Sequence, residues 1–423
     1  MRIKTTEVET WVGQKVELQG WLYWKRDLGG ISFALLRDGY GVLQVVFKGG
    51  GELPMLESAL RVRGEVASSS QAPGGFELVA EDLEVLSPAL EPPPVELPKE
   101  AWRANPETLL DYRYVTLRGE RARAPLALQA ALVRGYRKFL DSEGFTEVFT
   151  PKIVAAGAEG GAALFPVQYF EQKAFLAQSP QLYKQMLVGV FERVYEVAPV
   201  FRAEEHATPR HLNEYLSLDL ELGFISGLDD LLSLHEQLLA AMLKEAQEKA
   251  AQALAVLEAD FPALPLPLPR ISLYEARELL RERYGHRMES KDLDPEGERI
   301  LGQHFRELGS DWVFVTHYPV EARPFYAYPG PEGTTISFDL LFRGLEITTG
   351  GQRIHEYGAL IEAMRSRGID QSAFKGYLET FRHGMPPHGG FAIGAERITA
   401  RIAGLPNVRY ARAFPRDRRR LWP

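Results

Sequence analysis

Prolines 92–94 form an uninterrupted run, and this run divides the chain into two parts with different hydrophobic patterns. Consecutive prolines hold the backbone extended and stiffen a linker. We therefore interpret residues 89–118 as a proline-rich linker or hinge. The preceding residues, 1–88, have the pattern of a small β-domain, whereas residues 119–423 alternate between helical and strand patterns.

The first part contains five short apolar segments separated by glycine-containing turns. Their sequences are KVELQGWLYW, ISFALLRD, GVLQVVFK, ALRVRGEVAS and GFELVAEDLEVLS. Five strands with regular turn signals are typical of a small closed barrel, and the OB-fold is the five-stranded barrel. A generic small β-domain is the alternative that the pattern alone leaves open.

The second part is predicted to be α+β, with helices flanking a mostly antiparallel sheet. Residues 226–256 have the periodicity of an amphipathic helix, and helical signals continue through an insertion at about 226–310. The segment FTEVFTPKIV is predicted to be a strand. Further strand-like segments follow from residue 312, and FAIGAERITARIAG ends on a helix. The chain is therefore expected to be a multidomain α+β protein.

The composition limits the classes of function. With 423 residues and 45% hydrophobic residues, the chain can form two or three domains with substantial cores. It has no cysteine, which excludes disulfides and thiolate metal sites and favours a cytoplasmic protein. No apolar segment approaches the ~20 residues needed to cross a bilayer, so no membrane partner is expected. The net charge of −8 does not mark the whole surface as nucleic-acid binding, although a local basic face is compatible with it.

Alternating side chains in VYEVAPVFRAE and YLSLDLEL predict two strands of a hairpin, with one apolar face and one polar face. In YLSLDLEL the leucines share one face, and the other face carries Tyr215, Ser217, Asp219 and Glu221. A solvated sheet face is the ordinary alternative. Against it, Arg202 offers a planar fork of donors for a phosphate, and Tyr215 offers a ring for stacking on a base.

A second hairpin is predicted in SFDLLFRGLEITTGGQR. With the turn at residues 343–344, Leu341 faces Glu346 and Asp339 faces Thr348, which places Asp339 and Glu346 diagonally on one face. Two carboxylates over a sheet suit Mg²⁺, which proteins usually hold through one or two carboxylates plus substrate phosphates. Two unrelated surface acids are the alternative.

Seven ordered segments resemble the class II aminoacyl-tRNA synthetases, and within them the aspartyl enzymes of the compact archaeal type. GFTEVFTPKIV is similar to the first motif of that class, FRAEEHATPRHLNE to the second and GGFAIGAERI to the third. AEGGAALF, QSPQLYKQ, GLEITTGGQRIHEY and FPRDRRRLWP are additional family-like segments, so the resemblance covers essentially the whole chain. One position departs from the pattern, because Ala392 stands where the third motif usually has glycine.

The resemblance implies that the protein binds ATP, L-aspartate and tRNA(Asp), and that it works in two steps. Aspartate attacks the α-phosphate of ATP to give aspartyl-adenylate and pyrophosphate, and the terminal ribose of the tRNA then takes the aspartyl group. Neither step needs a protein nucleophile, so the chemistry is positioning and charge neutralisation. The implied catalytic residues are Arg202 and Arg397. The implied ATP-binding residues are Arg202, Glu204, Arg210, His211, Tyr215, Glu346 and Arg397.

The same resemblance implies the remaining sites. Mg²⁺ is the implied cofactor, held by Asp339 and Glu346, and Pro151 stands where related enzymes form a homodimer interface. The implied aspartate-binding residues are Glu159, Gln181, Lys184, Asp219, Thr349 and Arg353, with Lys184 and Arg353 pairing with the side-chain carboxylate of the substrate. The implied anticodon-binding residues of the barrel are Arg26, Phe33, Gln44 and Glu77. Without the family, Phe33 is more simply a core residue.

The choice of tRNA depends on the last anticodon base, which is C in tRNA(Asp) and U in tRNA(Asn). In strict compact aspartyl enzymes, a tryptophan in the strand after the GW pair helps to shape the pocket for this base. The matching position here is Tyr23, with Trp24 adjacent. A smaller ring with a hydroxyl predicts a looser pocket, and therefore a relaxed enzyme that also aspartylates tRNA(Asn).

Three other classes of protein are alternatives to this interpretation. An asparaginyl-tRNA synthetase shares the architecture, but Lys184 favours the aspartyl enzyme. An amidoligase such as ammonia-dependent asparagine synthetase lacks the N-terminal barrel. A non-enzymatic tRNA-binding paralogue is expected to lose Arg202, Arg397 or the acidic pair, and the chain retains all of them.

Overall fold

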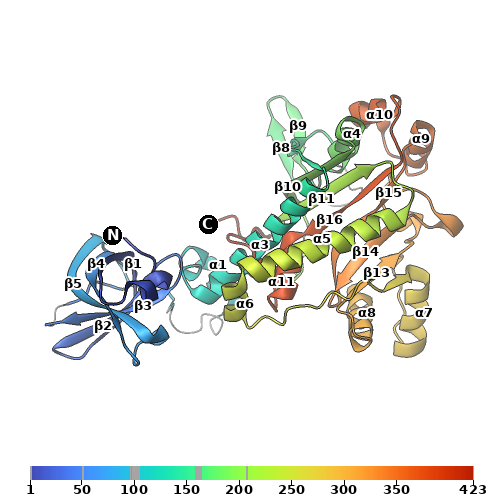
Figure 1. The fold of residues 1–423 in the computed structure, drawn as a ribbon. Helices are drawn as coiled ribbons and strands as arrows, with labels where there is room; N and C mark the ends of the chain where they lie inside the picture. Colours follow the sequence, from blue (N-terminus) through green and yellow to red (C-terminus); the bar gives the residue numbers. More distant parts are fainter. Residues whose placement is uncertain are drawn as a thin grey trace. The chain divides into compact units, whose positions relative to one another are not determined.

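The computed structural model describes residues 2–49, 52–95, 97, 105–157, 164–205 and 208–422. The chain separates into two units, Met1–Ala122 and Arg123–Pro423, and each is described by itself (Figure 1).

The first unit is a closed five-stranded barrel with the strand order β1-β2-β3-β5-β4, which confirms the predicted OB-fold. Neighbouring strands are antiparallel except β3 and β5, which are parallel. Inward-facing aliphatic residues such as Leu18, Leu36 and Val62 form its core. The strands are β1 (Lys15–Asp27), β2 (Ile31–Arg37), β3 (Val42–Lys48), β4 (Ala59–Ser68) and β5 (Phe76–Ser87).

Two short helices follow the barrel strands in the first unit, α1 (Pro106–Asp111) and α2 (Arg113–Thr116). Asn105 caps α1 by accepting a hydrogen bond from the Glu107 backbone N–H, and Pro106 occupies the first helical position, where no donor is needed. These helices lie inside the segment that the sequence marks as a linker, so its later part is helical rather than extended.

The second unit is built on an eight-stranded sheet with the order β12-β13-β14-β15-β16-β11-β10-β6. Its pairs are antiparallel except β12 with β13 and β10 with β6, which confirms the mostly antiparallel prediction. The strands are β6 (Thr146–Glu147), β10 (Arg193–Phe201), β11 (Glu214–Gly223), β12 (Arg270–Ser272), β13 (Trp312–Thr316), β14 (Ser337–Phe342), β15 (Leu345–Arg353) and β16 (His388–Gly394). A three-stranded sheet has the order β7-β9-β8 and consists of β7 (Ile153–Val154), β8 (Pro166–Tyr169) and β9 (Gln172–Leu176).

Helices α3, α5 and α11 cover one face of the large sheet, whereas α7 and α8 cover only part of the other face and leave a polar region on it. The main core joins Leu128 of α3, Leu238 of α5 and Ile398 of α11 to Leu218 and Leu220 of β11. In Figure 1, α5 runs along the sheet. The helices are α3 (Glu120–Ser142), α4 (Gln181–Phe191), α5 (Leu228–Lys249), α6 (Ala251–Leu257), α7 (Leu273–Tyr284), α8 (Pro295–Glu307), α9 (Tyr357–Arg365), α10 (Lys375–Phe381) and α11 (Ala395–Ile402).

Two segments differ from their predicted form. The expected strand FTEVFTPKIV splits into β6 and β7, which belong to different sheets. Between them, Pro151 has no N–H for a ladder, and the Thr150 N–H donates to the Glu196 carboxylate at 2.8 Å. The predicted helix at 226–256 is interrupted at Ala250, so that it forms α5 and α6.

The β14–β15 hairpin has the predicted turn but a different register. Arg343 and Gly344 both have positive φ, 48° and 71°, as a tight two-residue hairpin turn requires. Leu341 faces Glu346 as predicted, but Asp339 faces Thr349 rather than Thr348. The reason is a β-bulge in which Ile347 is the additional residue.

Within the described residues, the structure contains no helix with both the length and the apolar character needed to cross a membrane.

Candidate functional site

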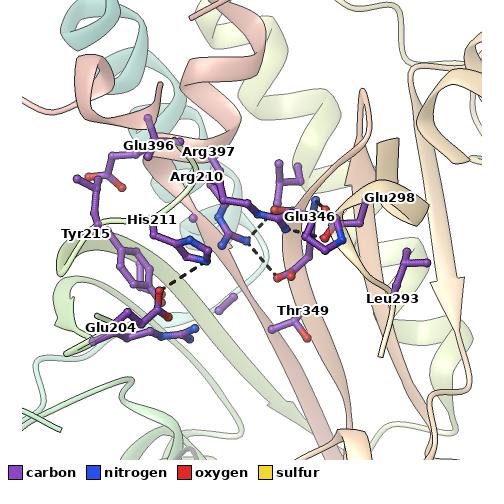
Figure 2. Close-up of a pocket in the computed structure, with 18 residues that line it drawn as sticks. Glu204, Arg210, His211, Tyr215, Leu293, Glu298, Glu346, Thr349, Glu396 and Arg397 are labelled. Carbon is purple, nitrogen blue, oxygen red and sulfur yellow. Dashed lines mark hydrogen bonds and ion pairs between the residues drawn. The ribbon is translucent and has the colours of Figure 1, made fainter. Parts of the chain in front are cut away.

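A cavity of about 330 Å³ lies on the polar face of β11, β15 and β16 (Figure 2). The structure brings together here all seven residues that the resemblance assigns to ATP, although they come from distant segments. They are Arg202, Glu204, Arg210, His211, Tyr215, Glu346 and Arg397. What they bind stays a prediction.

One end of the cavity presents an aromatic ring beside a cation. The guanidinium of Arg202 lies 5.5 Å from the centre of the Tyr215 ring. The Asn213 side-chain amide donates to the carbonyl oxygens of Arg202 and Glu204 at 2.8 and 3.1 Å, which ties together the two sides of the intervening loop. This end therefore has a flat ring and a phosphate-compatible cation in a braced position.

His211 stands beside Glu204 at the same end, with its Nε2 3.5 Å from the carboxylate (Figure 2). Burial lowers the pKa of His211 below its usual value, and the arginines around the cavity lower it further, whereas Glu204 raises it. At neutral pH the imidazole is therefore mainly uncharged, and it contributes hydrogen bonds rather than positive charge.

The opposite end of the cavity contains two cations and two acids (Figure 2). Arg397, in the first turns of α11, donates through Nη1 to the Glu346 carbonyl oxygen at 2.9 Å. Arg210 donates through Nη2 to Glu298 of α8 at 2.6 Å. The second carboxylate oxygen of Glu298 accepts the Glu346 N–H at 2.8 Å. Glu298 therefore joins the loop between β10 and β11, which carries Arg210, to β15.

Glu298 and Glu396 are buried acids of this cavity that the sequence analysis did not single out. Burial and the nearby Glu346 carboxylate together raise the pKa of Glu298 to about 7, against the effect of Arg210. Burial also raises the pKa of Glu396 to about 7, although Arg412 and the Leu216 N–H stabilise its charged form. Both acids hold elements together, because each accepts a backbone N–H from a strand of the sheet.

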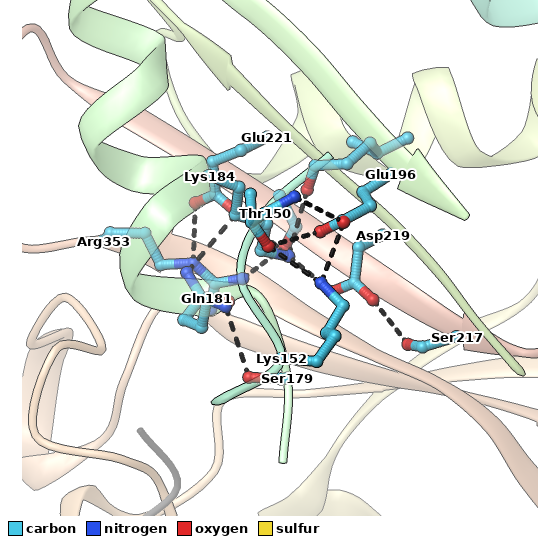
Figure 3. Close-up of polar contacts among 12 residues, drawn as sticks. Thr150, Lys152, Ser179, Gln181, Lys184, Glu196, Ser217, Asp219, Glu221 and Arg353 are labelled. Atoms are coloured by element: carbon cyan, nitrogen blue, oxygen red, sulfur yellow. Dashed lines mark hydrogen bonds and ion pairs between the residues drawn. The ribbon is translucent and has the colours of Figure 1, made fainter. Parts of the chain in front are cut away.

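A second polar cluster lies deeper on the same sheet (Figure 3). The Lys184 ammonium, on α4, lies 3.1 Å from Asp219 and 3.3 Å from Glu221. Arg353 donates through Nε to Glu221 at 2.9 Å, and the Gln181 amide lies 3.5 Å from Glu221. Four of the predicted aspartate-binding residues are thus brought together, and Glu221 is the acid that links them.

Glu221 is completely buried. The strand pattern predicts its place on the polar face but no role for it. Burial favours the neutral acid, but the charges of Arg353 and Lys184 outweigh it and lower the pKa of Glu221. The carboxylate therefore stays ionised and holds both cations at fixed positions.

The two polar regions are joined by one row of residues that runs across the sheet. The strand registers align Asp339, Thr349, Ala392, Asp219 and Glu196 on five consecutive strands. Thr349 is assigned to aspartate by the resemblance, but it lines the first cavity and accepts from Arg323 at 3.2 Å instead of joining the Lys184 cluster.

The two candidate metal ligands lie in different environments. Glu346 lines the first cavity, whereas Asp339 is buried beside it and pairs with Arg323 at 2.7 Å. Burial raises the pKa of Asp339, and Glu346 adds to this, while Arg323 opposes it. The Asp339 Oδ1 atom is buried and has no hydrogen-bond partner within the described residues. No cluster of three acidic or histidine side chains suited to a metal is found in the described part of the chain.

In the barrel, the predicted anticodon residues lie on the outer face of adjacent strands. Arg26 pairs with Phe33 across β1 and β2. Phe33 is half-buried and lies outside the barrel core, in contrast to the simpler core interpretation. The Gln44 amide donates to Glu77 at 2.8 Å across β3 and β5. These side chains form an accessible polar and aromatic surface.

The role of Tyr23 in anticodon selection stays a prediction. The Arg37 guanidinium lies 5.1 Å from the Trp21 ring and 5.6 Å from the Tyr23 ring, so these two rings lie on the same face of β1. Tyr23 is the additional residue of a β-bulge in β1, and its hydroxyl donates to the Leu97 carbonyl at 2.9 Å. Trp24 instead pairs with Leu35, so it lies on the outer face with Phe33 and is 37% exposed. The bulge therefore brings Trp24, next to Tyr23, to the face that carries the predicted anticodon residues.

Glu159, the remaining predicted aspartate-binding residue, lies outside the described residues.

Comparison with known proteins agrees with this geometry. Residues 105–418 match the family model "tRNA synthetases class II (D, K and N)", and residues 16–86 match "OB-fold nucleic acid binding domain". The chain is 63% identical over 424 residues to "Aspartate--tRNA(Asp/Asn) ligase" of Thermus thermophilus, with 100% of both chains covered. It is 56% identical over 430 residues to the protein of the same name from Deinococcus radiodurans, with 100% of this chain and 99% of the relative covered.

Among solved structures, the chain is similar to the asparaginyl-tRNA synthetase of Pyrococcus horikoshii complexed with asparaginyl-adenylate. That similarity has a TM-score of 0.93 and 33% identity, and it covers 100% of both chains. The fold, the ordered motifs and these matches agree with one another: the chain belongs to the class II tRNA synthetases of the D, K and N group and carries an OB-fold anticodon-binding domain.

Proposed function

We propose that the enzyme joins L-aspartate to both tRNA(Asp) and tRNA(Asn). The names of two full-length relatives, each more than half identical to the chain, support this substrate pair. One observation carries the proposal. Lys184 and Arg353 are buried and both pair with Glu221, and two neighbouring cations suit a side-chain carboxylate.

In the first step, a carboxylate oxygen of aspartate attacks the α-phosphorus of ATP. A new O–P bond forms, the bond from the α-phosphorus to the bridging oxygen breaks, and pyrophosphate leaves with the electron pair. Arg202 neutralises charge on the α-phosphate, and Tyr215 stacks on the adenine, with Arg397 on the other side of the ring. Glu204, Arg210 and His211 position the base and the outer phosphates. The enzyme thus acts by placing groups and stabilising charge.

Selection of aspartate rests on the cluster around Glu221. Arg353 presents a planar fork for both oxygens of the substrate carboxylate, and Lys184 supplies a point charge. Asp219 and Gln181 handle the ammonium and carboxylate region of the substrate. A neutral asparagine amide cannot form the charge-assisted contacts that a carboxylate forms with these cations, which costs several kcal/mol.

In the second step, a hydroxyl of the terminal ribose of the tRNA attacks the aspartyl carbonyl carbon, and AMP leaves. The barrel recognises the anticodon: Phe33 and Trp24 stack on unstacked bases, and Arg26, Gln44 and Glu77 contact base edges or phosphates. The fold similarity to an asparaginyl-tRNA synthetase favours that enzyme as the second candidate, but the paired cations at Lys184 and Arg353 favour aspartate.

Mg²⁺ is the proposed metal, and the available residues fit it. Glu346 faces the cavity, and the unpartnered Oδ1 of Asp339 adds a second hard oxygen nearby. When bound, the metal would neutralise charge on the ATP phosphates. Arg323 holds Asp339 in place through the contact at 2.7 Å, and its charge favours the ionised carboxylate against the effect of burial.

Removal of either acid is expected to raise the Mg²⁺ concentration needed for adenylate formation. In Glu346→Gln and Asp339→Asn, the Mg²⁺ midpoint of aspartate-dependent pyrophosphate exchange should rise about tenfold, the loss of one charged ligand contact, while tRNA binding changes little. Glu362→Gln, an exposed acid on α9, is the matched control. An unchanged Mg²⁺ midpoint in both variants would exclude this metal site.

We also propose a homodimer that forms around Pro151. Phe149 is 82% exposed and Ile153 is 46% exposed, so two apolar side chains flank this proline at the surface. A symmetric partner would cover both. Light scattering at micromolar concentration should give twice the mass of the chain, and the mass of one chain would refute the dimer.

Relaxed tRNA choice is tested by aspartylation of unmodified tRNA(Asp) and tRNA(Asn) transcripts. We expect kcat/KM for the two to differ by about tenfold or less. Trp24→Ala should weaken both, because this ring lies on the outer face, whereas Tyr23→Phe should leave both unchanged, because its hydroxyl is bound to Leu97. A preference for tRNA(Asp) beyond about a thousandfold, or ~4 kcal/mol, contradicts the proposal.

A further inference from the structure

A second cavity, of about 290 Å³, adjoins the first on the side of α8 and α11. The two cavities share Arg210, Pro295 and Val408 as lining residues. Arg210 therefore stands at their junction, at the end of the first cavity that also holds Glu298, Glu346 and Arg397 (Figure 2). The second cavity therefore begins where this charged end of the first cavity stops.

Among the residues that the structure describes, three arginines, Arg210, Arg299 and Arg401, and no acidic residue line the second cavity. The Nε atoms of Arg210 and Arg401 are both buried, and neither has a hydrogen-bond partner among the residues that the structure describes. Unused guanidinium donors in a partly enclosed space are the recognition elements of a phosphate group.

Helix α11 connects this cavity to the segment that resembles the third motif, GGFAIGAERI. Arg397 and Arg401 are four residues apart on α11, which places them on the same face of the helix, one turn apart. Arg397 lines the first cavity and Arg401 the second. The two side chains thus form consecutive positive positions along one helix.

The charge around Arg401 is incompletely balanced. Burial lowers the pKa of Arg401 below its ordinary value, and the positive charges of Arg210 and Arg343 also lower it, while Glu298 opposes them. Arg210 is itself paired with Glu298, and Arg299 with Glu296, whose contact is 2.7 Å. An anion in the cavity would relieve the repulsion between Arg210 and Arg401.

We propose that this arginine cavity receives pyrophosphate after adenylate formation, and that Arg401 binds the product but not ATP. This inference rests on the proposed function, because pyrophosphate is the leaving group of that reaction. When the bond from the α-phosphorus to its bridging oxygen breaks, the electron pair stays with pyrophosphate. The freed anion then has an additional negative oxygen, and it moves past Arg210 toward Arg401.

The test compares Arg401→Met with Arg401→Lys and with Arg299→Met, whose side chain lies at the exposed rim. Arg365→Met, an exposed arginine on α9, is the matched control. Four quantities are measured on the full-length enzyme: the affinity for inorganic pyrophosphate by calorimetry, the KM values for pyrophosphate and for ATP in exchange, and the KM for tRNA. Thermal unfolding of each variant confirms that it is folded.

We expect Arg401→Met to weaken pyrophosphate binding about tenfold, the loss of one charge-assisted contact. The KM for ATP and the KM for tRNA should change less than about twofold. Arg401→Lys should recover part of the affinity because it restores the charge, and Arg299→Met should give a smaller loss. Should Arg401→Met fail to fold, Arg401→Lys and Arg299→Met must still weaken pyrophosphate binding.

Unchanged pyrophosphate affinity in the Arg401 and Arg299 variants overturns the proposal. An equal rise in the KM for ATP also overturns it, because Arg401 would then contact the intact nucleotide. A rise in the KM for tRNA alone would assign the cavity to the tRNA backbone. If the wild-type enzyme binds pyrophosphate through Arg401 but does not exchange it in the presence of aspartate, the proposed function fails and the pyrophosphate site stands.

Discussion

The contact between Glu221, Arg353 and Lys184 determines the arrangement of the polar cluster that we propose to bind the amino acid. All three side chains are buried, so each charge depends on the others for compensation. Removal of Glu221 would leave two cations close together without a carboxylate between them. The backbone adapts to this contact, because Arg353 also donates to the Gly390 carbonyl at 2.9 Å. A side chain at position 390 would collide with Glu221 and with the Leu220 carbonyl, so only glycine fits there.

The row that crosses the sheet explains how the two ends of the site work together. Neighbouring strands lie about 4.8 Å apart, so Asp219 and Thr349, separated by Ala392 on the strand between them, are about 10 Å apart. This distance leaves room for an amino acid at one end and a nucleotide phosphate at the other. The small side chain of Ala392 lines the first cavity without closing it. The departure from glycine at this position is therefore compatible with the fold.

Local patterns predicted much of this architecture. Alternation alone assigned the faces of β11, and the motifs identified residues that meet in one cavity. The sequence could not reveal contacts between distant segments, such as Glu298 with Arg210, because no periodic signal connects α8 to the loop between β10 and β11. Single-residue bulges were also missed. The bulge at Ile347 changed the partner of Asp339, and the bulge at Tyr23 gave Trp24 the ladder position opposite Leu35.

Pyrophosphate exchange with aspartate and with asparagine tests the account most directly, because it isolates the pocket around Glu221 from the choice of tRNA. The wild-type enzyme should prefer aspartate by about a thousandfold in kcat/KM, or ~4 kcal/mol. Arg353→Leu should lose exchange with aspartate while ATP still binds in calorimetry, since Arg353 lies outside the first cavity. Comparable exchange with asparagine in the wild type, or normal aspartate exchange in Arg353→Leu, would contradict the assignment of the buried cations to the substrate carboxylate.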